Sequence, residues 1–227
     1  MAIICRNYNL LFIMTPRTAC TAIGELLCQR YGGEFIPSHD ILDSRGHILV
    51  DKKHSTLSDL IKHKLLATEE ANSLLKVAAV RNPFDSLVSL YYKQRSKYQP
   101  LLSDPASWVN RLPGYAGSMR YARAHSFNLW VLRVSYRKLI KRLLGFRPSM
   151  FAEHTRGVDV VMRYENIEAD LDAVFRKAGM GCEAKIPTVN RTGERPNSDY
   201  RSCYSRLTEI AVTLAYSGDL KMYGYTF

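Results

Sequence analysis

Two segments place a cation and hydroxyl groups directly after short apolar runs. TPRT (15–18) follows the run Asn9–Met14, and Arg81 follows the run Lys76–Val80. Each run predicts a buried strand, and the residues after it predict a helix. In open α/β sheets, ligands bind beyond the carboxyl ends of the strands, where unpaired amides and the positive end of a helix dipole favour anions. Both segments therefore have the composition of an anion site.

The first loop, TPRTACTA (15–22), carries one cation at Arg17 and hydroxyl groups at Thr18 and Thr21. Either threonine could cap the following helix, which we expect to end near Arg30. The loop lacks the G-x-x-x-x-G-K-[ST] pattern, which disfavours a kinase that binds ATP with Mg²⁺. The alternative interpretation is an ordinary strand–helix turn with a surface arginine.

The second segment, RNPFDSLVSLYY (81–92), begins with an arginine whose fork can hold a phosphate through two hydrogen bonds. Asn82 and Pro83 predict the start of a helix. Ser89 follows Arg81 by eight residues, about two turns into that helix, where its hydroxyl could meet the same phosphate. The structural alternative is an ion pair between Arg81 and Asp85, with Ser89 as an ordinary helical residue.

Together these segments resemble the sulfotransferases that use 3′-phosphoadenosine 5′-phosphosulfate (PAPS). TPRTACTAI looks like their 5′-phosphosulfate loop, and RNPFDSLVSLYY looks like their 3′-phosphate motif, with its arginine and serine eight residues apart. Further similar segments follow in family order, and the last resembles the carbohydrate-type branch: KHSTLSDL (53–60), VVMRYENIEADLDAVFRKAG (160–179), NRTGERPNSDYRSCYS (190–205) and SGDLKMYGYTF (217–227). The likeness spans nearly the whole chain.

Two positions depart from the family pattern. Many relatives have lysine where Arg17 stands, although the tyrosylprotein and some bacterial branches have arginine there. Arginine keeps the charge, so anion binding should survive. Most relatives have glycine where Cys20 stands, and a side chain there restricts how closely the backbone approaches a phosphate.

The resemblance implies roles for individual residues. Arg17 and the amides of Thr18–Ala22 would hold the 5′-phosphosulfate, and Arg17 would also neutralise charge on the bridging oxygen as the S–O bond breaks. Arg81 and Ser89 would hold the 3′-phosphate, with help from an arginine of the late loop (Arg191, Arg195 or Arg201). The residues expected to bind PAPS are therefore Arg17, Thr18, Ala19, Cys20, Thr21, Ala22, Arg81, Ser89, Arg191 and Arg195.

Sulfuryl transfer also needs a base for the acceptor's proton, and neutral imidazole suits that task near pH 7. His54 lies at the head of KHSTL (53–57), after the strand candidate Gly46–Asp51, where carbohydrate-type relatives often place a catalytic histidine. The alternative is a solvated histidine just before a helix. His39 in the segment PSHD is the second candidate, and Lys53 could assist the sulfuryl group.

Strand and helix candidates alternate three times along the chain, the third pair being Val158–Tyr164 and Ile167–Ala178. This order predicts an α/β domain with a parallel sheet. At 227 residues the chain has the length of one sizeable domain. The resemblance implies a P-loop-like, three-layer domain over residues 1–227, with a central parallel sheet flanked by helices.

The composition is that of a globular protein with a formal net charge of +11, which favours anionic ligands or surfaces. The basic residues are spread along the chain apart from a cluster at Arg133–Arg147. No cysteines or histidines have metal-ligand spacing, so we expect no metal. We also expect no membrane partner and a cytoplasmic location, because no apolar run approaches the length of a bilayer span.

The sequence thus predicts a PAPS-dependent sulfotransferase that releases PAP, the desulfated product. The acceptor would be a hydroxyl or amine of a glycan or small molecule, and nucleic acid is not an expected partner. The alternatives are a basic nucleic-acid-binding protein, indicated by the net charge, and a divergent P-loop kinase.

Overall fold

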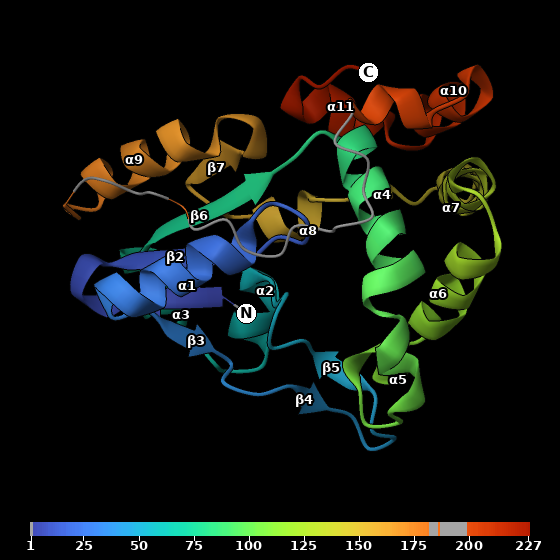
Figure 1. The fold of residues 1–227 in the computed structure, drawn as a ribbon. Coiled ribbons are helices and arrows are strands. Elements are labelled where there is room, and N and C mark those ends of the chain that lie inside the picture. The colour runs from blue at the N-terminus through green and yellow to red at the C-terminus, as the bar shows by residue number, and fades with distance from the viewer. Residues whose placement is uncertain (1, 182–185, 187–198) are drawn as a thin grey trace. The chain divides into compact units, whose positions relative to one another are not determined.

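The computed structural model describes residues 2–181, 186 and 199–227. The chain divides into two compact units (Figure 1). The first unit comprises Met1–Arg81 and Phe151–Arg191, and the second comprises Asn82–Met150 and Thr192–Phe227. Each unit therefore takes two separate stretches of the sequence. The prediction of one domain over residues 1–227 stays a prediction.

The first unit is built on a five-stranded sheet with the order β3-β1-β2-β6-β7. Its strands are β1 (Ala2–Cys5), β2 (Leu10–Ile13), β3 (Glu34–Ile36), β6 (Leu75–Val80) and β7 (Val160–Arg163). β2, β6 and β7 are parallel neighbours, whereas β1 is antiparallel to both β2 and β3. Because only the 3₁₀ turn η1 (Arg6–Tyr8) and Asn9 connect β1 to β2, these strands form an antiparallel pair. The predicted strands β2, β6 and β7 are confirmed, but the sheet is mixed.

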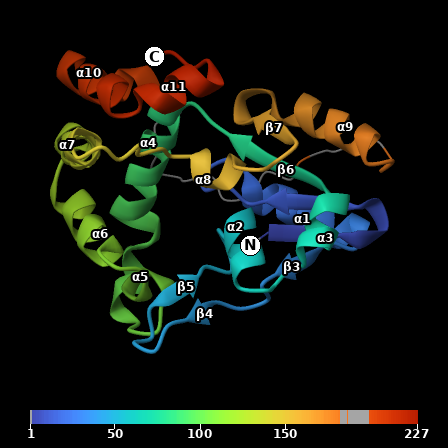
Figure 2. The ribbon, with the colours of Figure 1, turned by 180° about the vertical axis from the view of Figure 1, so that it is seen from behind.

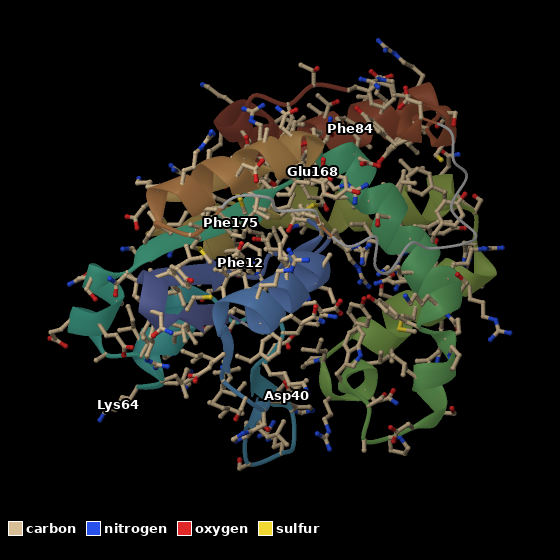
Figure 3. The ribbon with its side chains drawn as sticks, turned by 60° about the vertical axis from the view of Figure 1, so that its left-hand side comes forward. Phe12, Asp40, Lys64, Phe84, Glu168 and Phe175 are labelled. Atoms are coloured by element: carbon tan, nitrogen blue, oxygen red, sulfur yellow. The ribbon has the colours of Figure 1, made fainter. Side chains whose placement is uncertain are left out.

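Helices cover both faces of this sheet, as the two opposite views show (Figures 1 and 2). On one face, Phe12 of β2 packs in a cluster with α1 (Cys20–Tyr31) and with Phe175 of α9 (Ile167–Lys177) (Figure 3). Its neighbours along the strand face the other side. There Leu11 and Ile13 pack in a cluster with α2 (Leu57–Lys62) and α3 (Thr68–Ser73). The predicted arrangement of a sheet between helices is therefore present in this unit.

Helix α1 packs unusually close to strand β1. A side chain added at Gly24 would place its Cβ 2.7 Å from Ile3 Cδ1 and 3.3 Å from Met14 Cε. After the helix, a Cβ at Gly33 would lie 2.8 Å from Ile3 Cγ2. Ile3 thus fills space that two glycines leave open, and this packing holds α1 close to β1.

The first unit also contains a small antiparallel pair of strands and a short helix. β4 (Ile41–Leu42) pairs with β5 (Ile48–Val50), which confirms part of the strand predicted at Gly46–Asp51. The helix α8 (Ala152–Thr155) precedes β7. The turn after β5 carries His54, so this pair of strands matters for the site.

In the described residues of the second unit, all the regular secondary structure is helical. Its helices are α4 (Pro83–Tyr92), η2 (Lys93–Lys97), η3 (Gln99–Ser103), α5 (Trp108–Arg111), α6 (Tyr115–Ala124), α7 (Phe127–Leu143), η5 (Tyr200–Cys203), α10 (Arg206–Ala215) and α11 (Ser217–Tyr223). Asn82 caps α4 by accepting a hydrogen bond from Phe84 N at 3.0 Å, as predicted. The Phe84 ring packs against Tyr204 and Phe227, with ring centroids 5.4 and 4.8 Å away.

Within residues 2–181, 186 and 199–227, no helix has both the length and the apolar character needed to cross a membrane. The predicted location in the cell is not tested by this observation.

Candidate active site

The loop between β2 and α1 holds two non-glycine residues in the left-handed region. Arg17 has a φ of 71° and Ala19 a φ of 58°. Such a conformation costs about 1–2 kcal/mol per non-glycine residue, so the surrounding structure must enforce it. Left-handed residues within a turn direct successive N–H groups toward one concave side, which is a recurring way of binding anions. The strain therefore marks this loop as a candidate site.

The first turn of α1 adds further amides to this loop. Its N-cap is Ala19, which makes no side-chain cap, and the turn comprises Cys20–Ala22. The prediction that Thr18 or Thr21 caps the helix is therefore wrong. Thr18 instead donates its Oγ1 hydrogen to Thr15 O at 2.9 Å and so closes the preceding turn. The amide groups at the positive end of the helix dipole are left for a ligand.

Arg81 follows one strand and contacts residues that follow the two neighbouring strands. It follows β6, which lies between β2 and β7 in the sheet. Its Nη1 donates a hydrogen bond to Arg17 O at 3.1 Å, and its guanidinium stacks 3.9 Å from the ring centroid of Tyr164, just after β7. The side chain is only 5% exposed. Arg81 thus braces the strained residue of the loop and places a second positive charge beside it.

His54 contacts the same loop from the turn after β5. Its Nδ1 lies 2.8 Å from Met14 O. A carbonyl oxygen only accepts hydrogen bonds, so Nδ1 carries the proton and Nε2 keeps its lone pair. Burial lowers the pKa of His54 to about 3, and the positive charge of Lys53 acts in the same direction. The imidazole is therefore neutral at pH 7, with one nitrogen ready to accept a proton.

A second histidine supports this turn. His154 of α8 places Nε2 3.2 Å from His54 O, and the two rings meet edge to face with centroids 6.5 Å apart. The same acceptor argument assigns the proton of His154 to Nε2. Its Nδ1 is buried without a hydrogen-bond partner among the described residues. Burial lowers the pKa of His154 as well.

Cys20 sits at the start of α1, under the influence of two cations. Burial raises the pKa of its thiol, although the charges of Lys53 and Arg17 act in the opposite direction. The thiol is therefore protonated at pH 7 and adds no negative charge to the loop. This keeps the loop electropositive around Arg17 and Lys53.

The remaining predicted residues are Ser89, Arg191, Arg195 and the alternative base His39. Ser89 is a buried residue of α4 and belongs to the second unit. Arg191 and Arg195 lie outside the described residues. His39, the alternative base, lies on an exposed loop with its Nδ1 3.0 Å from Ser38 Oγ. The first unit thus brings together Arg17, Thr18, Ala19, Cys20, Thr21, Ala22, Arg81 and His54.

Sequence reasoning did not identify two contacts of this site, the stacking of Tyr164 on Arg81 and the bond from His154 to His54 O. The first had a usable signal, because an aromatic residue directly after a third parallel strand must lie near the ends of the other two. The second had none, since a hundred residues separate the two histidines.

The chain matches the model of the Sulfotransferase family over residues 1–226. A relative in Rattus norvegicus, carbohydrate sulfotransferase 11, is 24% identical over 244 residues. The match covers 97% of this chain but 65% of the rat protein, so the chain spans less than two thirds of that relative's length. No solved structure matches the chain. The predicted resemblance to the sulfotransferase family is thereby confirmed, and the chain belongs to that family.

Proposed function

We propose that this protein is a PAPS-dependent sulfotransferase that acts on a hydroxyl or amine of a glycan or small-molecule acceptor. The observation that carries this proposal is the loop at residues 15–19, in which Arg17 and Ala19 are left-handed and Arg17 O accepts a hydrogen bond from Arg81. Left-handed residues, an open helix end and two guanidinium groups form a site for a multiply charged anion. PAPS is such an anion, and we expect Arg17 and the amides to hold its 5′-phosphosulfate and Arg81 to hold its 3′-phosphate.

Arg17 would act on the leaving group. In the transfer, a bond forms between the acceptor atom and sulfur, while the bond between sulfur and the bridging oxygen breaks. That oxygen keeps the electron pair and leaves on PAP. A guanidinium that stabilises this developing charge lowers the barrier more than it improves ground-state binding. Arg17 suits this role because it is the cation of the left-handed loop that we propose binds the 5′-phosphosulfate.

His54 would accept the acceptor's proton at Nε2. The hydrogen bond from Nδ1 to Met14 O fixes the ring and its tautomer, as a general base requires. A pKa of about 3 makes this base weak before a ligand arrives. A bound anion nearby favours the protonated form, so the donor itself should raise the pKa of His54 toward a useful value.

Calorimetry with PAP and with AMP tests the proposed donor. The two nucleotides differ in the 3′-phosphate, so a PAPS enzyme should bind PAP markedly more tightly than AMP. Arg81→Ala should remove this preference, whereas Arg120→Ala, on the exposed surface of α6, should keep it. Equal binding of PAP and AMP by the wild type would contradict the proposal. An acceptor screen that detects the mass gain of a sulfuryl group then identifies the second substrate.

A further inference from the structure

The net positive charge of the chain is concentrated in one stretch, because that stretch contains few acidic residues. Residues 82–150 contain twelve Lys or Arg and two Asp or Glu, a net charge of +10 out of the chain's +11. The rest of the chain is nearly balanced. All of this stretch belongs to the second unit, whereas the loop and Arg81 belong to the first. The second unit therefore attracts anions through its own basic residues, without a contribution from Arg17 or Arg81 of the first unit.

Within this stretch, one cavity of about 620 Å³, open to solvent, is lined by Arg95, Ser96, Gln99, Pro100 and Arg123, and both arginines are exposed. It involves η2, the segment that continues α4 and packs against α6 (Figure 1). η2 is a π-helical segment, a rare form that is frequently found at functional sites. None of the lining residues is acidic. The volume lies in the range of small-molecule sites and far exceeds that of an inorganic ion.

Arg95 is fixed in place before any ligand binds. Its Nη1 lies 3.0–3.1 Å from Tyr91 Oη and from the carbonyl oxygens of Ala122 and His125, at the end of α6. These contacts use one arm of the guanidinium. The other arm, Nη2, and Nε have no hydrogen-bond partner among the described residues. A rigid guanidinium with an open edge is a preorganised donor for an oxyanion.

Arg123 supplies a second guanidinium from α6. Its side chain is exposed and makes no hydrogen bond or ion pair with any residue that the structure describes. Two like charges that line one cavity repel each other, and an anion between them relieves that repulsion. Arg95 and Arg123 thus favour a ligand with a negatively charged group.

Two oxygen atoms of the protein, Gln99 Oε1 and Ser96 Oγ, indicate which other groups the ligand carries. Gln99 donates both amide hydrogens of Nε2, to Gln94 O at 2.6 Å and Met119 O at 3.1 Å, so its Oε1 remains an acceptor. Ser96 donates its hydroxyl hydrogen to Tyr92 O at 2.8 Å, so its Oγ also remains an acceptor. Acceptors on the protein require donors on the ligand, such as hydroxyl groups.

We propose that this cavity is a second ligand site, which binds a carboxylate or sulfate carried on a hydroxyl-bearing molecule. Arg95 and Arg123 hold the oxyanion, and Gln99 and Ser96 accept hydrogen bonds from the hydroxyl groups. The site shares no residue with the loop at 15–19, so it does not depend on the proposed donor. Its ligand is either the acceptor of the sulfuryl group or a separate molecule of the same chemistry.

Binding of glucuronate, glucose and inorganic sulfate to the full chain at constant ionic strength tests this proposal. Glucose lacks the carboxylate, and sulfate lacks the hydroxyl-bearing body. NMR signals of the arginine Nε–H groups report which side chains are affected. We expect saturable binding of glucuronate that shifts Arg95 and Arg123, with glucose and sulfate each binding at least tenfold more weakly.

Arg123→Gln and Arg120→Gln form the matched pair of variants. Both remove one charge from α6, but only Arg123 lines the cavity. We expect Arg123→Gln to weaken glucuronate binding about tenfold or more and Arg120→Gln to change it less than twofold. Equal losses in the two variants would overturn the proposal, because they would show attraction by bulk charge. Sulfate that binds as tightly as glucuronate would overturn it as well.

Kinetics with an identified acceptor distinguish the two sources of the ligand. If the acceptor occupies the cavity, Arg123→Gln raises its KM and leaves the KM for PAPS unchanged. If a separate molecule binds there, both KM values stay as in the wild type while glucuronate binding is lost. Since the binding experiment contains no PAPS, its failure is separate from any failure of the proposed donor.

Discussion

Arg81 both holds the backbone of the loop and supplies a positive charge beside it. One arm of its guanidinium holds Arg17 O, and its face lies on the Tyr164 ring. Lysine could supply the charge but neither the flat face nor the fork. The same side chain therefore shapes the loop and contributes charge to it, which explains why a cation follows β6 directly.

The first residue-scale prediction concerns His54. A general base contributes about 10²–10⁴-fold to rate, so His54→Ala should lower turnover by a factor in that range. The affinity for PAP, measured by calorimetry, should stay within about threefold because Nε2 is the atom left for the acceptor. His39→Ala is the control. If His39→Ala loses activity and His54→Ala does not, His39 is the base.

Arg17 gives a second prediction at this scale. Arg17→Ala should reduce kcat more than it weakens binding of PAP, because a leaving-group interaction is strongest in the transition state. Single-turnover rates and calorimetry separate the two effects. Arg17→Lys should recover part of the rate by restoring the charge. A loss of affinity with an unchanged rate would make Arg17 a binding residue only.

At the scale of elements, the strained loop predicts an unusual response to glycine. Ala19 has a φ of 58°, so Ala19→Gly removes strain of about 1–2 kcal/mol, against about 0.5–1 kcal/mol from the more flexible unfolded chain. Stability should therefore stay constant or rise by up to about 1.5 kcal/mol. Ala22→Gly, in the first turn of α1, should lower it by about 0.5–1 kcal/mol. Urea unfolding measures both, and equal losses would show that Ala19 is not strained.

The elements that the sequence predicts best are those with unbroken apolar runs. β2 and β6 lie inside the sheet with helices on its faces, and their runs mark them clearly. β7 is an edge strand with Val161 exposed, and its shorter run Val160–Met162 still marks it. β1 was not predicted, because Arg6 and Asn7 interrupt the apolar residues at the turn that joins it to β2. That hairpin is what makes the sheet mixed.

In the site too, features set by local sequence could be predicted, whereas contacts between distant residues could not. The cations and the helix start after β2 follow from local order, so Arg17, Arg81 and the α1 amides could be predicted. The left-handed φ of Ala19 could not, because threonine neighbours favour an ordinary cap. The contact between His54 and Met14 O depends on how the turn after β5 packs against the sheet, which no local pattern encodes.

For the whole molecule, the two half-buried histidines His54 and His154 predict how stability depends on pH. Burial lowers the pKa of His54 to about 3 and lowers that of His154 below the usual 6.5. The unfolded chain therefore binds protons near pH 6.5 while the folded chain does not. The stabilisation is complete above pH 6.5 and is lost as pH falls toward the folded values.

We expect the free energy of unfolding to fall between pH 7 and pH 5, by at most about 1.4 kcal/mol per pH unit for each histidine. Urea titrations at three pH values measure the slope. His154→Gln should make the slope shallower, whereas His39→Gln, on the exposed loop, should leave it as in the wild type. A slope that does not change with His154→Gln would show that its ring is charged in the folded protein.

The contact between Gly24 and Ile3 has a consequence for the speed with which the loop captures an anion. Because α1 lies against β1 without an intervening side chain, the first turn of the helix has little freedom to shift. A loop already in its binding conformation has no slow ordering step before capture. Stopped-flow measurements with inorganic phosphate should show a single phase whose rate rises linearly with concentration. Gly24→Ala pushes the helix away from Ile3, and capture should then show a second, concentration-independent phase.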